Sequence, residues 1–106
     1  MVKAYKLVRV RKDSARKLGP LFIDRKRVYP MHEWLKAETV PTKGFALRPG
    51  FHCCSQPVAP HLTKEGRVWV EVLIKGVKKH QRPISQGGLW YTAKQMKIEK
   101  QLWYLM

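Results

Sequence analysis

GFALRPGFHCCSQPVAPHLTKEGRVWVEVLI, residues 44–74, contains the most regular strand pattern in the chain, and directly before it the most chemically varied segment. Side chains alternate between the two faces of a strand, so within Arg67–Ile74 one face is entirely apolar: Val68, Val70, Val72 and Ile74. The other face carries Trp69, Glu71 and Leu73 and is partly solvated. Such a strand is typical of a position inside a sheet. We therefore predict that Arg67–Ile74 is the structural centre and that the segment before it lines any site.

The length and composition predict one folded domain over residues 1–106. A chain of 106 residues has room for a single core, and its 44% hydrophobic content is too high for a disordered tail. No apolar run approaches the roughly 18 residues that span a bilayer. The first residues, Met1–Lys6, are basic but alternate at once with apolar residues, unlike a signal peptide. We expect a cytoplasmic protein, in a host cell if the chain is of phage origin.

The charge balance is the strongest functional signal. Twenty-two Lys and Arg against seven Asp and Glu give a net charge of +15. Residues 1–48 hold thirteen basic and four acidic side chains, and residues 49–106 hold nine and three. An even excess over a foldable chain indicates a basic surface on a globular domain rather than a basic arm. A polyanionic partner, RNA or DNA or a nucleic-acid-containing complex, accounts for it most simply.

The remaining segments predict an α+β fold, with a small, strongly curved, mostly antiparallel sheet of five to seven strands and one short helix. Further strands are expected at Ala4–Arg11, Leu21–Ile23, Leu89–Tyr91 and the tail Gln101–Met106, with Ala93–Ile98 a turn and a strand. We interpret Lys12–Pro20 as a loop and Lys75–Pro83 as a polar basic run after the central strand. The helix is expected over Met31–Glu38, because Met31, Trp34 and Leu35 share one helical face after Pro30.

Several motifs together resemble a family of small phage and prophage proteins. They are Arg48–Cys53 (RPGFHC), Ala59–Leu62 (APHL), Gly66–Val72 (GRVWVEV) and Arg82–Gly88 (RPISQGG), with Glu33–Leu35 and Pro41–Phe45 in agreement. The resemblance covers most of the chain and implies a phage setting, with no established activity. It also implies acidic residues after the central strand, where this chain has Lys75, Lys78, Lys79 and His80. That departure favours a strengthened anion-binding role.

The two cysteines do not suggest a metal site or a structural disulfide. Cys53 and Cys54 are adjacent, so a bond between them would need a strained ring, and on extended chain they point to opposite sides. Zinc sites use cysteines separated by two to four residues. We predict no metal and no cofactor, with one buried and one partly exposed thiol.

Two enzymatic alternatives remain open, in a possible pocket formed by Arg48, His52, Cys53, His61, Trp69 and Glu71. Two histidines and a lysine suffice for metal-free RNA cleavage, and His52, His61 and His80 could supply the histidines. An ADP-ribosyl-transfer-like site would use Arg9 to grip a pyrophosphate and Glu71 to face the reacting sugar. Glu71 paired with an arginine of a neighbouring strand is the simpler interpretation.

Nucleic-acid binding without catalysis needs residue types that are abundant in this chain. Lys and Arg neutralise phosphates, and exposed Trp or Tyr stack on bases. A protein of this kind can also inhibit a host defence complex by occupying its nucleic-acid groove. The predicted contact residues form three basic clusters: Arg9, Arg11, Lys12, Arg16 and Lys17; Arg25, Lys26 and Arg27; and Lys78, Lys79 and Arg82. Arginine makes bidentate phosphate contacts, so Arg9, Arg11 and Arg16 are expected to contribute most, and the third cluster next.

Overall fold

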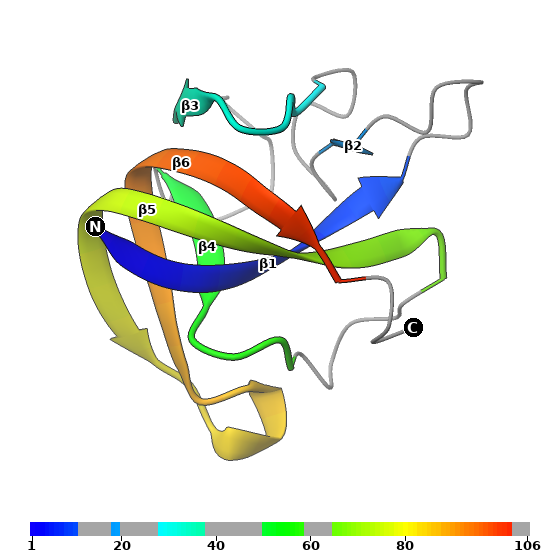
Figure 1. Ribbon diagram of the computed structural model, residues 1–106. Helices are drawn as coiled ribbons and strands as arrows, with labels where there is room; N and C mark the ends of the chain where they lie inside the picture. Colours follow the sequence, from blue (N-terminus) through cyan, green and yellow to red (C-terminus); the bar gives the residue numbers. More distant parts are fainter. Residues whose placement is uncertain (11–17, 20–27, 38–49, 59–64, 103–106) are drawn as a thin grey trace, which may run out of the picture.

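The strands in the part of the chain that the structure describes form one six-stranded sheet (Figure 1). The computed structural model describes residues 1–10, 18–19, 28–37, 50–58 and 65–102. The strands are β1 (Val2–Val10), β2 (Leu18–Gly19), β3 (Trp34–Lys36), β4 (Phe51–Cys54), β5 (Arg67–Gln81) and β6 (Leu89–Gln101), and one 3-10 turn, η1 (Ile84–Gln86), joins β5 to β6. All strand pairings are antiparallel. The predicted small, curved, mostly antiparallel sheet is confirmed.

Four of the strands pair in a closed ring. β5 pairs with both β1 and β6, and β4 pairs with both β6 and β1. The seam between β1 and β4 is the weakest, since it holds the single residue pair Tyr5–Cys54. The half-buried Lys6 reinforces it, because its Nζ donates a hydrogen bond to the carbonyl oxygen of His52 at 2.7 Å. A closed ring leaves few strand edges open to other chains.

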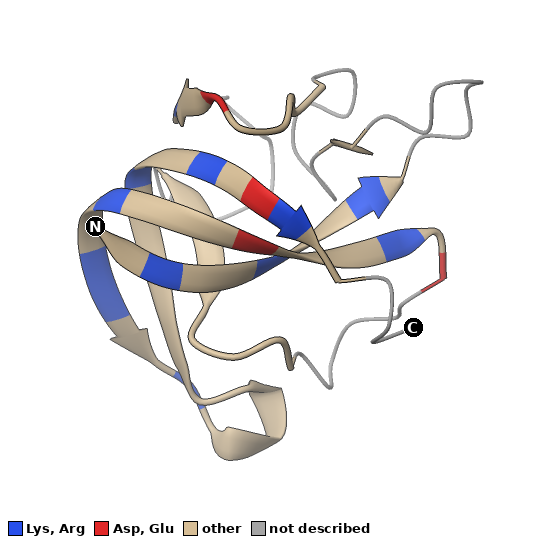
Figure 2. Ribbon diagram, in the orientation of Figure 1, with Lys and Arg blue, Asp and Glu red and all other residues tan. Residues whose placement is uncertain are grey.

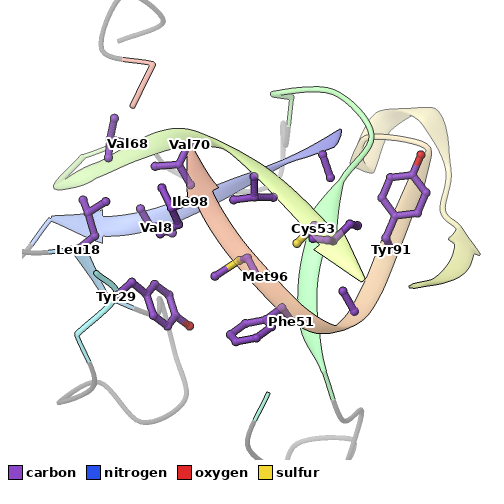
Figure 3. Close-up of a cluster of buried hydrophobic side chains, with 14 residues drawn as sticks. Val8, Leu18, Tyr29, Phe51, Cys53, Val68, Val70, Tyr91, Met96 and Ile98 are labelled. Atoms are coloured by element: carbon purple, nitrogen blue, oxygen red, sulfur yellow. The ribbon is translucent and has the colours of Figure 1, made fainter. Parts of the chain in front are cut away.

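The central strand has the two faces that its sequence predicts. The alternate positions Val68, Val70, Val72 and Ile74 are each at most 1% exposed and belong to the main core, with Met96 and Ile98 of β6 packed beside them (Figure 3). On the outer side, Trp69 is 2% exposed and packs with Leu7 and Leu102 in a second, smaller cluster. The predicted strand is therefore the centre of the sheet, and its outer face is only partly solvated.

A glycine bends the long β5–β6 ribbon. The inward-facing residues of β5 have even numbers up to Ile74, but beyond it the odd-numbered Val77 packs against the core. In β6 the inward-facing positions likewise change from even numbers at Met96 to odd numbers at Ala93. Gly76 lies at this change with φ of +65°, a value that disfavours a side chain. A Cβ on Gly76 would stand 2.9 Å from Lys94 Cβ. Gly76 thus allows the two strands to approach closely while the ribbon keeps its core face inward.

The helix predicted over Met31–Glu38 is wrong for residues 31–37, and Glu38 lies outside the described residues. Trp34–Lys36 pairs with β6 as β3, and backbone N–H groups of His32 and Ala37 donate to Ile98 and Lys94 carbonyls at 2.8 Å each. A two-turn helix satisfies few of its own backbone groups. The edge of β6 supplies those partners instead. In the part of the chain that the structure describes, no helix is long and apolar enough to cross a membrane.

Three segment boundaries also differ from prediction. Leu18–Gly19, placed in a loop, pairs with Val10 and Arg9 as β2, while the expected strand Leu21–Ile23 lies outside the described residues. β5 does not end at Ile74 but continues to Gln81, and β6 runs unbroken through the turn expected near Ala93. Each strand extends because the other supplies hydrogen-bond partners from the pair Val70–Gln101 to the pair Gln81–Leu89.

Candidate nucleic-acid interface

The distal part of the β5–β6 ribbon carries positive charge and no acid. Between Glu71 and Glu99 the chain has no Asp or Glu, and it has six Lys or Arg together with His80. Figure 2 shows Lys and Arg positions on both strands of this ribbon. We call residues 72–98 the basic ribbon; its cations are Lys75, Lys78, Lys79, Arg82, Lys94 and Lys97. Clustered charges of one sign raise the local concentration of oppositely charged partners.

Each of the two glutamates that border the basic ribbon lies beside a lysine, and one of these lysines, Lys97, belongs to the ribbon. Glu71 Oε1 lies 3.5 Å from Lys3 Nζ. Glu99 lies 3.0 Å from Lys97 Nζ and 3.5 Å from His32 Nδ1, and the hydrogen bond from Lys97 lowers the pKa of this carboxyl. Exposed pairs of this kind contribute little to stability. Lys3, Lys97 and His32 are thus the groups next to the two acids that border the basic ribbon.

Trp90 organises one end of the basic ribbon. It lies on the outward face of β6 yet is only 4% exposed, because cationic and aromatic side chains cover it. The His80 ring stacks on it at 4.4 Å between centroids, the Arg82 guanidinium lies 4.0 Å from its centroid, and the His52 ring lies 5.1 Å away. His80 Nε2 is 2.9 Å from the Oγ1 of Thr92, which is itself 8% exposed. These contacts fix the orientation of a histidine and an arginine.

A second tryptophan marks the other end. Trp34 of β3 is half-buried, with Lys75 Nζ 4.0 Å and Lys97 Nζ 5.3 Å from its ring centroid. Leu35, its neighbour, packs against the core, so Trp34 faces outward. One end of the basic ribbon therefore combines an indole with two lysines, and the other combines an indole with Arg82 and two imidazole rings. In nucleic-acid-binding surfaces, Lys and Arg contact the phosphates, and aromatic side chains beside them stack on the bases of single strands.

The tip of the ribbon is a short ordered turn beside a shallow pocket. The pocket has a volume of about 500 Å³ and is lined by His80, Gln81, Arg82, Pro83, Gln86 and Trp90. Backbone hydrogen bonds from Gln86 to Pro83 at 2.8 Å and from Gly87 to Ile84 at 3.0 Å close the turn. Ile84 is 91% exposed. The tip thus presents one large apolar side chain next to Arg82.

The cysteines agree with the structural interpretation predicted for them. Cys53 is 1% exposed in the main core, and burial raises its pKa to about 11, while Cys54 is half-buried on the outer face. Burial also raises the pKa of Cys54, against the opposing effects of Arg82 and Lys6. Burial lowers the pKa of Lys6 in turn. A buried thiol with a raised pKa is a poor nucleophile, so the surroundings of Cys53 fit a core residue.

The structure separates the residues of the predicted pocket. His52 is exposed on β4, while Cys53 and Trp69 belong to two different hydrophobic clusters. Glu71 lies on β5 beside Lys3, with β1 between it and β4, so it pairs with a lysine rather than an arginine. Arg48 and His61 lie outside the described residues. The ADP-ribosyl-transfer-like layout needs Arg9 and Glu71 around one ligand; in the sheet Arg9 lies opposite Arg67, and Glu71 lies opposite Tyr5, four residues before Arg9.

The structure places only some residues of the three predicted basic clusters. Lys78 and Lys79 are exposed on β5, and Arg82 follows that strand. Arg9 is half-buried on β1 opposite Arg67 of β5, and its Nε is buried. The other predicted contacts lie outside the described residues: Arg11, Lys12, Arg16, Lys17, Arg25, Lys26 and Arg27. Only the third cluster can therefore be placed on a surface.

Sequence reasoning missed Trp34 as a surface residue and Thr92 as the partner of His80. Trp34 was assigned to a helix, and its alternation with Leu35 was the signal that favours a strand. Thr92 lies between two apolar residues, Tyr91 and Ala93, and one strand pattern through Leu89–Ile98 would have placed it on the outer face. Within the described ranges, no three His, Cys, Asp or Glu side chains lie close enough to hold a metal ion.

Comparison of the chain with protein-family models, curated proteins and solved structures gave no match. The phage-family resemblance stays a prediction.

Proposed function

We propose that this chain binds nucleic acid through the basic ribbon. The observation that supports it is the concentration of six Lys and Arg over residues 72–98 without any acid. Lysines 75, 78, 79 and 94 are exposed, and strands that pair over their full length hold them on a rigid frame. Phosphate contacts of this kind give affinity and position, and carry no sequence information by themselves. Sequence-independent binding to RNA or DNA is the expected behaviour.

The proposal explains why so much charge is tolerated. A net charge of +15 on a small domain opposes folding through self-repulsion, and bound phosphates relieve it. Binding releases condensed counterions from the nucleic acid, so affinity should fall steeply as salt rises. The two indole-containing ends of the ribbon would then limit where the phosphate backbone can lie.

A cytoplasmic phage setting gives the binding a biological use. The predicted family resemblance and the positive surface together favour a host complex that contains nucleic acid as the partner. Occupying a guide-RNA or target-DNA groove would inhibit a host defence system. Affinity capture from host lysate, with and without nuclease treatment, tests this part: recovery of free nucleic acid alone would contradict it and leave the binding proposal intact.

Charge reversal at two sites tests which surface makes the contact. The variant Lys78→Glu/Lys79→Glu should weaken binding at least tenfold, and more than Arg9→Glu/Arg11→Glu, because Arg9 is half-buried. Circular dichroism confirms that each variant is folded, and Lys→Gln and Arg→Gln pairs serve as milder versions. A larger loss from the Arg9 pair would place the contact at the end of β1 instead. Equal losses would indicate a diffuse field without a site.

Metal-free RNA cleavage is the second candidate function, because His52 and His80 contact the same indole ring. Their rings are therefore no further apart than the sum of the two distances to Trp90. One neutral imidazole would take the proton of a ribose 2′-OH, whose oxygen attacks phosphorus, while the other, protonated, gives its proton to the departing 5′-oxygen. The products are a 2′,3′-cyclic phosphate and a 5′-hydroxyl. Lys78 or Arg82 would stabilise the charged phosphorane.

A further inference from the structure

The turn at the tip of the basic ribbon holds an apolar side chain in water. Ile84 is 91% exposed, the highest exposure among the described large hydrophobic side chains, and Pro83 before it is also exposed. Figure 1 shows this turn at the opposite end of the ribbon from β3. One exposed apolar residue is ordinary on a protein surface. Its position here, on an ordered turn at the end of an acid-free basic ribbon, is what distinguishes it.

The turn is rigid enough to hold Ile84 in place. Four backbone hydrogen bonds cross it: Gln86 to Pro83 at 2.8 Å, Gly87 to Ile84 at 3.0 Å, Arg82 to Gly88 at 3.1 Å and Gly88 to Pro83 at 3.3 Å. Its base is supported from β4, because Ser55 donates to the Leu89 carbonyl through both Oγ, at 2.8 Å, and its backbone N–H, at 3.3 Å. A preorganised apolar side chain loses little conformational entropy when it is inserted into a partner.

We infer that Ile84 is a wedge that enters a base step of duplex DNA from the minor groove while the basic ribbon contacts the flanking phosphates. This inference rests on the proposed function. Proteins that kink DNA insert Ile, Leu, Met, Phe or Pro side chains between base pairs and hold the bent backbone with basic residues. The chain offers that set at one place: Ile84 and Pro83 at the tip, with Arg82, His80 and Lys79 directly before them.

The dimensions and charge favour DNA over a protein partner. From Val77 to Gln81 the ribbon extends five residues beyond its bend, about 17 Å at 3.3–3.4 Å per residue, enough to reach across a groove. A stable protein interface buries about 800 Å² on each partner. At the tip the described exposed apolar side chains are Pro83, Ile84 and Val58, and the backbone carbonyl of Val58 lies beside Gly87. A single protruding apolar side chain surrounded by positive charge fits a base step of DNA better than it fits a protein surface.

The test uses a duplex of about 25 base pairs labelled at its ends for energy transfer, with 2-aminopurine at a central TA step. At low salt the full-length protein should shorten the end-to-end distance and raise 2-aminopurine fluorescence, because pyrimidine–purine steps unstack easily. Ile84→Ala should keep the salt dependence of binding, lose more than half of both signals and bind about tenfold more weakly. Ile84→Phe should retain both signals. Val2→Ala, which truncates an exposed apolar side chain on β1, is the matched control and should behave as wild type.

Any of the following results would contradict the insertion of Ile84 into a base step. Duplex binding without either signal, or Ile84→Ala signals equal to wild type, would leave the proposed function standing and remove this inference. Binding to single strands alone would do the same. A wild-type dimer that Ile84→Ala dissociates would assign the tip to a second copy of the chain. Absence of binding to any nucleic acid would remove both proposals.

Discussion

Replacing Gly76 by alanine should destabilise the fold more than the same change at Gly66. Both glycines have nearly the same left-handed φ, +65° and +69°, so both substitutions incur the backbone cost of about 1–2 kcal/mol for a side chain in that region. Reduced freedom of the unfolded chain offsets roughly 0.4–1 kcal/mol of it at each position. The Gly66 variant should therefore lose about 1 kcal/mol.

The two positions differ in what a Cβ would meet. Nothing lies within 4 Å at Gly66, whereas at Gly76 the new Cβ would stand 2.9 Å from Lys94 Cβ and 3.0 Å from Cγ. The Lys94 Cβ is fixed to its backbone, so the strands must move apart, an overpacking cost of about 1–3 kcal/mol. We expect Gly76→Ala to lose about 2–4 kcal/mol in total.

Urea unfolding followed by tryptophan fluorescence measures the two free energies of unfolding. At roughly 4 °C per kcal/mol for a chain of this size, the melting temperature should fall by about 8–16 °C for Gly76→Ala and by about 4 °C for Gly66→Ala. Equal losses for the two variants would refute the close approach of β5 and β6 at this bend. A stabilised Gly76→Ala would refute the left-handed conformation there as well.

The remaining predictions concern the thiols and the two histidines. In the native protein a thiol reagent should modify Cys54 slowly and Cys53 only on unfolding; equal reactivity would contradict the burial of Cys53. In Lys6→Met, which removes the opposing amine, the stability that Cys53 contributes should be constant below pH 9.0 and fall as pH rises toward about 11, because the unfolded chain ionises Cys53 first; a rise in that contribution over this range would contradict the raised pKa. If the second candidate function holds, RNA but not DNA should be cleaved in the presence of a chelator, with activity lost in His52→Ala and His80→Ala and kept in His32→Ala; an activity that survives in both of the first two variants would exclude this pair.

The sequence predicts the centre of this fold well because its signal there is local. Alternation within Arg67–Ile74 specifies both faces of β5, and the buried valines confirm it. Adjacent cysteines on an extended chain must face opposite ways, so one buried and one half-buried thiol also follow from the sequence. Both predictions depend only on neighbours along the chain.

The edge strand and the extent of the ribbon depend on partners distant in sequence. Met31, Trp34 and Leu35 fit a helical period, yet the free edge of β6 supplies backbone hydrogen bonds that a two-turn helix lacks. Likewise Lys75–Gln81 has no strand pattern of its own and is extended because Leu89–Gln95 lies opposite. The cluster around Trp90 joins His52 with His80 across three strands. No spacing along the sequence predicts that contact.

The salt dependence of binding tests the central claim most directly. Filter binding of one labelled duplex and one labelled single strand, from about 50 to 300 mM salt, gives the slope of log affinity against log salt, near −0.9 per duplex phosphate contact. Lys78→Gln/Lys79→Gln should make the duplex slope shallower by about 2, whereas Lys3→Gln/Lys100→Gln, an equal charge change outside the basic ribbon, should leave it nearly unchanged. No retention of either probe at the lowest salt, or the same change in slope for both variants, would contradict binding through the ribbon.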